Sequence, residues 1–253
     1  MIDWHSHILP GLDDGARDID ESLAIGRLLS AAGFRTVHCT PHRLRGMYEI
    51  PASTVREACA ELQAVFDCEG VALHLLPGME YCLDEFFQDD FADPLPLGNS
   101  RWVLVETPSQ PDLDLLKENV FFLRRTGYIP LLAHPERLAF LAPPPAGNFF
   151  QDAVDFLRRS KDTPDAFSQT PLADLMQMGC LLQGNLGSIG GYYGGAVQRQ
   201  SERFRRHDLY AVIGSDAHHP EALGRFLQPA IDLLRKESSK LCTLSVDDCP
   251  GSG

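Results

Sequence analysis

Short apolar runs rich in β-branched residues alternate along the chain with longer amphipathic stretches. The short runs have the length of buried strands and cover residues 2–5, 36–40, 71–76, 102–106, 128–133, 180–183 and 209–214. The amphipathic stretches have helical spacing and cover residues 23–33, 54–68, 115–125, 153–159, 172–178, 197–207 and 226–235. This alternation predicts repeated βα units around a largely parallel sheet.

Glycine, proline and capping residues mark the expected element ends. Gly33 predicts the end of the first helix, and Thr54 with Glu57 forms a capping-box pattern that predicts the start of the second. The proline-rich segment 142–147 predicts a surface loop, and residues 184–195, with six glycines, predict a flexible loop after the sixth strand. With no internal repeat or long linker, we expect one domain over residues 1–236 and a frayed tail over 237–253.

Length and charge narrow the function classes. The 253 residues, 44% of them hydrophobic, suit a single α/β barrel. The formal net charge of -13 repels a phosphate backbone, which excludes nucleic acid as an expected partner. The chain has no apolar run of the roughly 20 residues that span a bilayer, and its opening lacks a signal-peptide pattern, so we expect a cytoplasmic protein without membrane insertion. Its 7 scattered cysteines, without a C-x-x-C pair, predict reduced thiols.

Ionisable side chains stand where the predicted strands end. In a barrel of parallel strands these carboxyl ends meet on one face, where barrel enzymes place their chemistry. The candidate ligands at this face are His5, His7, Asp14, His42, Glu80, Glu106, His134, Asp216 and His218. Asp13 is the alternative to Asp14, because the two aspartates are adjacent.

The residue types of this set point to metal ions. His5 and His7 are two residues apart on an extended chain, so both rings face the same side, and Asp216 and His218 repeat that spacing. Imidazoles and carboxylates without a thiolate suit Mn, Fe or Zn, and bridging carboxylates hold neighbouring ions together. The sequence therefore predicts a multinuclear metal centre.

A competing motif lies between His38 and Arg45, which has the H-C-x5-R spacing of cysteine-dependent tyrosine phosphatases. That loop needs successive backbone N–H donors and a cysteine at a helix N-terminus. Pro41 removes one donor, no glycine lies inside the loop, and no helix pattern follows Arg45 directly. We therefore expect Cys39 to be a small buried strand residue.

Six motifs together resemble the PHP (polymerase and histidinol phosphatase) superfamily. They are Asp3-Trp4-His5-Ser6-His7 with its continuation to Gly15, Thr40-Pro41-His42, Gly78-Met79-Glu80-Tyr81, Glu106-Thr107-Pro108, His134-Pro135-Glu136-Arg137 and Gly214-Ser215-Asp216-Ala217-His218. They occur in family order across residues 1 to about 236. Within the superfamily the chain is most similar to the bacterial manganese-dependent protein-tyrosine phosphatases of capsule and exopolysaccharide loci, the CpsB/YwqE type.

The resemblance implies a distorted seven-stranded, TIM-like βα barrel with a trinuclear centre, loaded with Mn²⁺ or alternatively with Fe or Zn. It implies three ligand sets and two arginines that hold the substrate phosphate. One ion would be held by His5, His7, Glu80 and Asp216, the second by Glu80, Glu106 and His134, the third by Asp14, His42 and His218, and the phosphate by Arg137 and Arg225. Asp14 and His42 are also expected to serve in catalysis.

The implied activity is hydrolysis of a phosphomonoester by direct attack of a metal-bound hydroxide, without a phosphoenzyme. Cations neutralise the phosphate oxygens and lower the pKa of a bound water, and a phenolate leaves without strong acid assistance. The resemblance favours phosphotyrosine as substrate, on an autophosphorylated tyrosine kinase of polysaccharide synthesis. Two alternatives stay open: a small-molecule phosphoesterase such as a histidinol phosphatase, and a non-catalytic regulator that binds metal.

Overall fold

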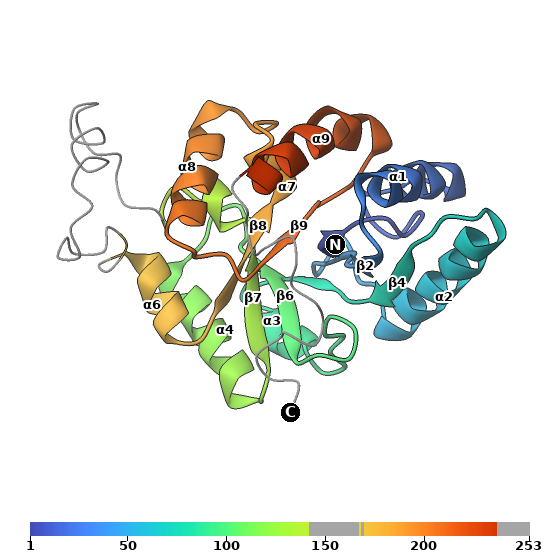
Figure 1. Ribbon diagram of the computed structural model, residues 1–253. Coiled ribbons are helices and arrows are strands. Elements are labelled where there is room, and N and C mark those ends of the chain that lie inside the picture. The colour runs from blue at the N-terminus through green and yellow to red at the C-terminus, as the bar shows by residue number, and fades with distance from the viewer. Residues whose placement is uncertain (142–166, 168–169, 237–253) are drawn as a thin grey trace.

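The described strands lie in two sheets, each made of parallel strands (Figure 1). A computed structural model describes residues 1–141, 167 and 170–236. The three-stranded sheet has the order β1-β2-β4 and the six-stranded sheet the order β3-β5-β6-β7-β8-β9. The strands are β1 (Ile2–Ser6), β2 (Thr36–Cys39), β3 (His42–Arg43), β4 (His74–Pro77), β5 (Glu80–Cys82), β6 (Trp102–Glu106), β7 (Ile129–Ala133), β8 (Leu181–Asn185) and β9 (Val212–Gly214).

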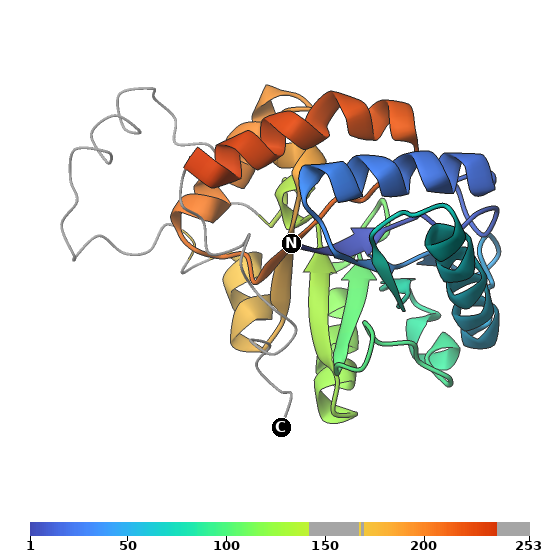
Figure 2. The ribbon, with the colours of Figure 1, turned by 45° about the vertical axis from the view of Figure 1, so that its right-hand side comes forward.

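Helices connect the strands and cover the sheets. They are α1 (Ile19–Ala32), α2 (Ala52–Cys68), α3 (Phe87–Asp90), α4 (Leu113–Arg125), the 3-10 helix η1 (Pro135–Arg137), α6 (Pro171–Gln177), α7 (Leu186–Ile189), α8 (Gly195–Arg206) and α9 (Pro220–Lys236). In α1 the Asp18 side chain accepts a hydrogen bond from the Glu21 amide, and Gly33 ends the helix with a φ of 99°. The first and last long helices, α1 and α9, pack against each other (Figure 2). None of the helices in the described ranges is both long and apolar enough to cross a membrane.

The fold is a mixed α/β single domain with parallel sheets, and a closed seven-stranded barrel is not seen among the described strands. The second predicted strand, 36–40, corresponds to β2 alone, and β3 follows as a separate strand after Pro41, which has no amide hydrogen for a ladder. The third predicted strand, 71–76, corresponds to β4, and β5 follows as a separate strand after Gly78. Where β1 and β9 come together, the Asp216 amide donates to the His5 carbonyl at 2.8 Å and the His7 amide to the Ala217 carbonyl at 3.0 Å.

Both faces of the central strands are buried, which explains their continuous apolar runs. In β6, Val103 and Val105 join the large core under the helices, while Trp102 and Leu104 join a smaller cluster on the other face. Because side chains alternate along a strand, Glu106 continues the face of Trp102 and Leu104. The smaller cluster therefore leads along β6 directly to a candidate ligand.

Several predicted element bounds are wrong, among them the start of the seventh strand, which is Val212 of β9 and not residue 209. Residues 71–73 precede β4, although Val71 and Leu73 are buried. Helix α2 begins at Ala52, so Thr54 lies inside it and caps nothing. The predicted flexible loop 184–195 contains the end of β8 and the whole of α7, because the Asn185 side chain accepts hydrogen bonds from the first amides of that helix. Helix α9 begins six residues before the predicted position 226 and continues past Pro229. The predictions for residues 142–147, 153–159 and 237–253 lie outside the described residues.

Candidate metal centre

The carboxyl ends of the strands bring the nine candidate ligands together. β1 supplies His5 and leads to His7, and the loop after it supplies Asp14. The other six lie in β3, β5 and β6 or in the few residues that follow β7 and β9. Their ligand atoms form four overlapping groups, in each of which all atoms lie within 4.8 Å of one another. The groups are His7–Asp14–His42–His218, His5–His7–Asp216, His5–Glu80–His134 and His42–Glu80–Glu106.

Glu80 is the centre of the cluster. Its side chain is completely buried, with Oε2 3.2 Å from His5 Nε2, 3.4 Å from His7 Nε2 and 3.1 Å from His42 Nδ1. Its Oε1 lies 3.3 Å from His134 Nε2. Among the described residues, neither oxygen has a hydrogen-bond partner of standard geometry. A buried carboxylate needs compensation by cations or hydrogen bonds, so this environment fits a carboxylate that bridges metal ions.

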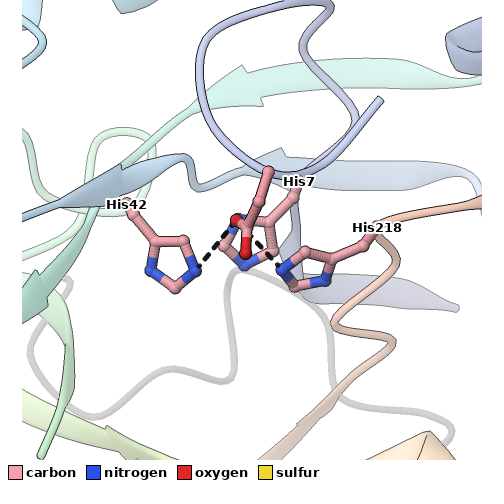
Figure 3. Close-up of side chains that lie close together, drawn as sticks. His7, His42 and His218 are labelled. Carbon is pink, nitrogen blue, oxygen red and sulfur yellow. Dashed lines mark ion pairs between the residues drawn. The ribbon is translucent and has the colours of Figure 1, made fainter. Parts of the chain in front are cut away.

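The outer part of the cluster faces solvent. Asp14 Oδ1 lies 3.5 Å from His42 Nε2 and 3.6 Å from His218 Nε2, and the Asp14 side chain is 55% exposed. Figure 3 shows the rings of His7, His42 and His218 close together, with the two ion pairs as dashed lines. A ligand from solvent would therefore meet this part of the cluster first.

The geometric grouping differs from the ligand sets that the resemblance implies, most clearly at His42 and Glu106. His42 reaches both sides of the cluster, because its Nδ1 also lies 3.1 Å from Glu106 Oε1. Glu106 is consequently grouped with His42 and Glu80, whereas His134 is grouped with His5 and Glu80. The shared Glu80 connects the two arrangements.

A second layer of side chains orients the imidazoles. Asp13 Oδ2 lies 2.7 Å from His7 Nδ1, and Gln183 Oε1 lies 3.1 Å from His5 Nδ1. The ring of His218 is held by the Asp216 carbonyl, 3.0 Å from its Nδ1. In each ring the Nε2 atom then faces the cluster, which is how outer groups fix metal-binding histidines. Asp13 and Asp14 thus occupy different layers.

Sequence reasoning missed Gln183 and the residues around Asp216. Asn185 Nδ2 donates to Asp216 Oδ2 at 2.8 Å, and the buried Asp3 accepts hydrogen bonds from the Ser215 amide and hydroxyl. A neutral amide in an apolar strand, such as Gln183 in β8, gives no pattern of its own. For Asp3 the sequence does offer a signal, because the residue belongs to the first motif, two positions before His5.

Two candidate ligands have strained backbone conformations. His134 has a φ of 37° and Asp216 a φ of 53°, in the left-handed region that residues other than glycine rarely adopt. His134 comes directly after β7, and Asp216 lies two residues after the end of β9. Such conformations cost of order 1–3 kcal/mol each and cluster at functional sites. A close backbone approach adds a further constraint, because a Cβ on Gly214 would lie 2.5 Å from His5 Cβ.

The charges of the cluster are strongly coupled. Burial alone would raise the pKa of Glu80, but the charge of His5 and the close imidazoles hold it well below its ordinary value. Burial would lower the pKa of His42, but contacts with Glu106 and Glu80 raise it to about 10. In the metal-free protein, protons therefore provide the positive charge that the buried carboxylates require. Metal ions would compete with those protons for the same nitrogen atoms.

The two arginines expected to hold phosphate are placed differently. Arg137 ends η1, and its Nη1 donates to Asp216 Oδ2 at 2.8 Å. Its guanidinium carbon lies 4.4 Å from the centre of the Tyr193 ring. Arg225 is an exposed residue of α9, and none of the contacts found among residues 1–141, 167 and 170–236 connects it to the cluster. Its role stays a prediction.

Cys39 does not have the environment of a nucleophile. The residue is completely buried in β2, and its Sγ lies 3.9 Å from the Sγ of Cys59. Burial raises the pKa of the Cys39 thiol well above its ordinary value, whereas a reactive cysteine needs a lowered one. Arg45, the arginine of the competing motif, forms an ion pair with Asp90 at 2.7 Å. The geometry agrees with the expectation that Cys39 is a structural residue.

Comparisons with known proteins identify similar chains. The family model for capsular polysaccharide synthesis proteins, CpsB/CapC, matches residues 1–144 and 165–246. The tyrosine-protein phosphatase YwqE of Bacillus subtilis (strain 168) is 31% identical over 239 residues, covering 94% of this chain and 85% of YwqE. The tyrosine-protein phosphatase CpsB of Streptococcus pneumoniae is 25% identical over 257 residues, covering 98% of this chain and 96% of CpsB.

A solved structure agrees with these sequence matches. It comes from the crystal structures of YwqE and CpsB, described as unique metal-dependent tyrosine phosphatases. That chain superposes with a TM-score of 0.74 at 31% identity, covering 94% of this chain and 87% of the other.

Proposed function

Because the chain belongs to the CpsB/CapC family, we propose that it is a metal-dependent protein-tyrosine phosphatase of capsule or exopolysaccharide synthesis. The observation that supports this most strongly is the cluster of nine imidazole and carboxylate ligands around the buried Glu80. The relatives named as tyrosine-protein phosphatases cover almost the whole chain.

The donor set fits Mn²⁺, with Fe or Zn as the alternatives, and its four overlapping groups have room for a trinuclear centre. His5, His7, Asp216, Glu80 and His134 would hold the buried ions. The outer ion would be held by His42, Asp14 and His218, with Glu106 beside His42. When bound, the ions neutralise phosphate oxygens and activate water for hydrolysis.

The residues of the chain would bind and orient the substrate phosphate. Arg137 is a phosphate ligand in this proposal, because its planar guanidinium can donate to two oxygens at once and its Nη1 lies 2.8 Å from the candidate metal ligand Asp216. Asp14 and His42 lie on the exposed side of the cluster, where the phosphate would enter. Arg225 is proposed as a second phosphate ligand, which requires its exposed side chain to extend from α9 to the same side.

We place the substrate phosphotyrosine on a partner protein, such as an autophosphorylated tyrosine kinase of polysaccharide synthesis, in the cytoplasm. The outer part of the cluster, at Asp14, faces solvent, which suits a phosphotyrosine side chain presented by another protein. Nucleic acid is disfavoured by the net charge of -13.

We also propose that the two sheets form a distorted seven-stranded barrel within a domain of residues 1–236. β2 with β3, and β4 with β5, would each count as one interrupted strand. The hydrogen bonds between residues at the ends of β1 and β9, together with the Ser6–Ala217 bridge, support closure at that point.

Initial rates on a phosphotyrosine peptide and on histidinol phosphate test the substrate class. We expect metal-stripped protein to be inactive, and added Mn²⁺ to restore hydrolysis with the peptide as the preferred substrate. A preference for histidinol phosphate would make the protein a small-molecule phosphoesterase. Metal binding without hydrolysis of either compound would make it a non-catalytic regulator.

A further inference from the structure

The segment between α7 and α8 carries an aromatic side chain to the edge of the metal centre. We propose that Tyr193 is a positioning residue: its ring is the platform that holds the Arg137 guanidinium in the orientation in which it binds phosphate. This inference rests on the proposed function only through the role of Arg137. It gives the glycine-rich segment 184–195 a structural purpose.

The guanidinium of Arg137 is fixed from two directions. Its carbon lies 4.4 Å from the centre of the Tyr193 ring, and its Nη1 donates to Asp216 Oδ2 at 2.8 Å. In the described part of the chain, Asp216 is the only hydrogen-bond acceptor found for this group. An arginine has five N–H donors, so the edge formed by the other nitrogen atoms is left for a ligand.

The local sequence explains why the ring of Tyr193 lies there. A Cβ on Gly187 would come within 2.7 Å of Tyr193 Cε2, so the glycine makes room for the ring. Asn185 connects this segment to the metal centre, since its Oδ1 accepts from the Gly187 amide at 2.7 Å and its Nδ2 donates to Asp216. The chain can then turn back, with Gly194 at a φ of 90° directly before α8.

Neighbouring aromatic residues support the platform. The ring of Tyr192 packs edge-on against Tyr193, with ring centres 5.2 Å apart, and it also contacts Phe226 of α9 at 5.4 Å. Tyr192 thereby connects Tyr193 to helix α9. A platform of this kind limits the rotamers of a long flexible arginine before the ligand arrives.

Stacking contributes in two ways. A guanidinium over an aromatic face gains about 0.5–2 kcal/mol, depending on burial. An arginine that is already ordered also loses less rotamer entropy when it binds an anion. Both contributions come from the ring and neither requires the hydroxyl, so phenylalanine should replace Tyr193 and an aliphatic residue should not.

The test uses inorganic phosphate as the probe, on Mn²⁺-loaded protein, with binding measured by calorimetry. We expect Tyr193→Leu to weaken phosphate binding about tenfold, the equivalent of about 1.4 kcal/mol, and Tyr193→Phe to bind within about twofold of the natural protein. In peptide hydrolysis, the same Leu variant should raise KM with little change in kcat. The matched control is Phe121→Leu, which removes an exposed aromatic ring on α4 and should leave phosphate binding unchanged.

A double-mutant cycle keeps the test independent of folding effects. In an Arg137→Ala background the Tyr193→Leu change should have no further effect on phosphate binding, since the partner is absent. If Tyr193→Phe and Tyr193→Leu lose the same phosphate affinity, the hydroxyl and not the ring has the role, and the proposal is overturned. An unchanged affinity in Tyr193→Leu, or the same loss with and without Arg137, would also overturn it. Phosphate binding does not depend on the substrate, so a natural protein inactive on phosphotyrosine would refute the proposed function alone.

Discussion

Adjacent aspartates with different roles give the sharpest prediction about the metal centre. Asp13 Oδ2 lies 2.7 Å from His7 Nδ1 and also accepts from the His42 amide at 2.9 Å, while Asp13 Oδ1 accepts from the Gly15 amide at 2.9 Å. An asparagine has one carbonyl oxygen. Asp13→Asn can therefore accept either from His7 and His42 or from Gly15, and it presents an N–H₂ group to the other partner. Asp14 instead directs its Oδ1 toward His42 and His218.

The expected loss of metal affinity differs between a residue that orients a metal ligand, such as Asp13, and a residue that is itself a ligand, such as Asp14. Loss of a group that orients a metal ligand lowers metal affinity about 10–100-fold, which is about 1.4–2.7 kcal/mol. We therefore expect Asp13→Asn to need more Mn²⁺ but to recover most of its peptide hydrolysis when metal is in excess. Asp14→Asn replaces a charged carboxylate ligand by a neutral amide at the metal itself, so excess metal should not restore its rate.

Chelator competition for Mn²⁺ affinity, followed by rates at saturating metal, measures both variants. The reasoning is refuted if Asp14→Asn recovers with excess metal while Asp13→Asn does not. That result would make Asp13 the metal ligand and Asp14 an exposed neighbour.

Three further predictions concern stability and phosphate binding. Burial lowers the pKa of His38 to about 3, so between that pH and about 6.5 the unfolded chain binds more protons and stability falls as pH falls. Between about pH 7 and pH 5, the free energy of unfolding of the metal-free natural protein, measured in urea, should fall by about 2 kcal/mol more than that of His38→Leu. Equal falls in the two proteins would contradict this. Gly214→Ala places a Cβ against His5 and should lower both stability, by about 1–3 kcal/mol, and bound metal, whereas Gly224→Ala, with open space around it, should lower neither. Arg137→Lys should raise KM for the peptide about tenfold with metal content unchanged, because lysine cannot donate from a planar fork; an unchanged KM would remove Arg137 from the phosphate site.

The ligand residues could be predicted because the apolar pattern shows where strands end. Glu106 ends a predicted strand whose bounds the structure reproduces at residues 102–106. His42 and Glu80 were found by the same reasoning, although each lies on a short strand of its own after a break. Parallel strands then determine that these side chains meet, whatever the details of the ladders.

The supporting residues could not be predicted, because their positions depend on tertiary contacts. Gln183 ends the predicted strand 180–183 and lies in the middle of β8, and only the fold shows that its amide oxygen reaches His5. Six glycines suggested a flexible loop over residues 184–195, yet Asn185 starts a four-residue helix there and Gly187 accommodates the Tyr193 ring. In this segment glycine provides space for close packing, which composition alone does not distinguish from flexibility.

The most direct test of the account is the rate of phosphotyrosine-peptide hydrolysis measured against Mn²⁺ bound per chain. The natural protein and Cys39→Ser should show the same rise in rate with bound metal, because the Cys39 thiol is buried away from the chemistry. Glu80→Gln, which removes the charge at the centre of the cluster, should bind less metal and stay inactive. Activity that is independent of metal and abolished by Cys39→Ser would contradict the account.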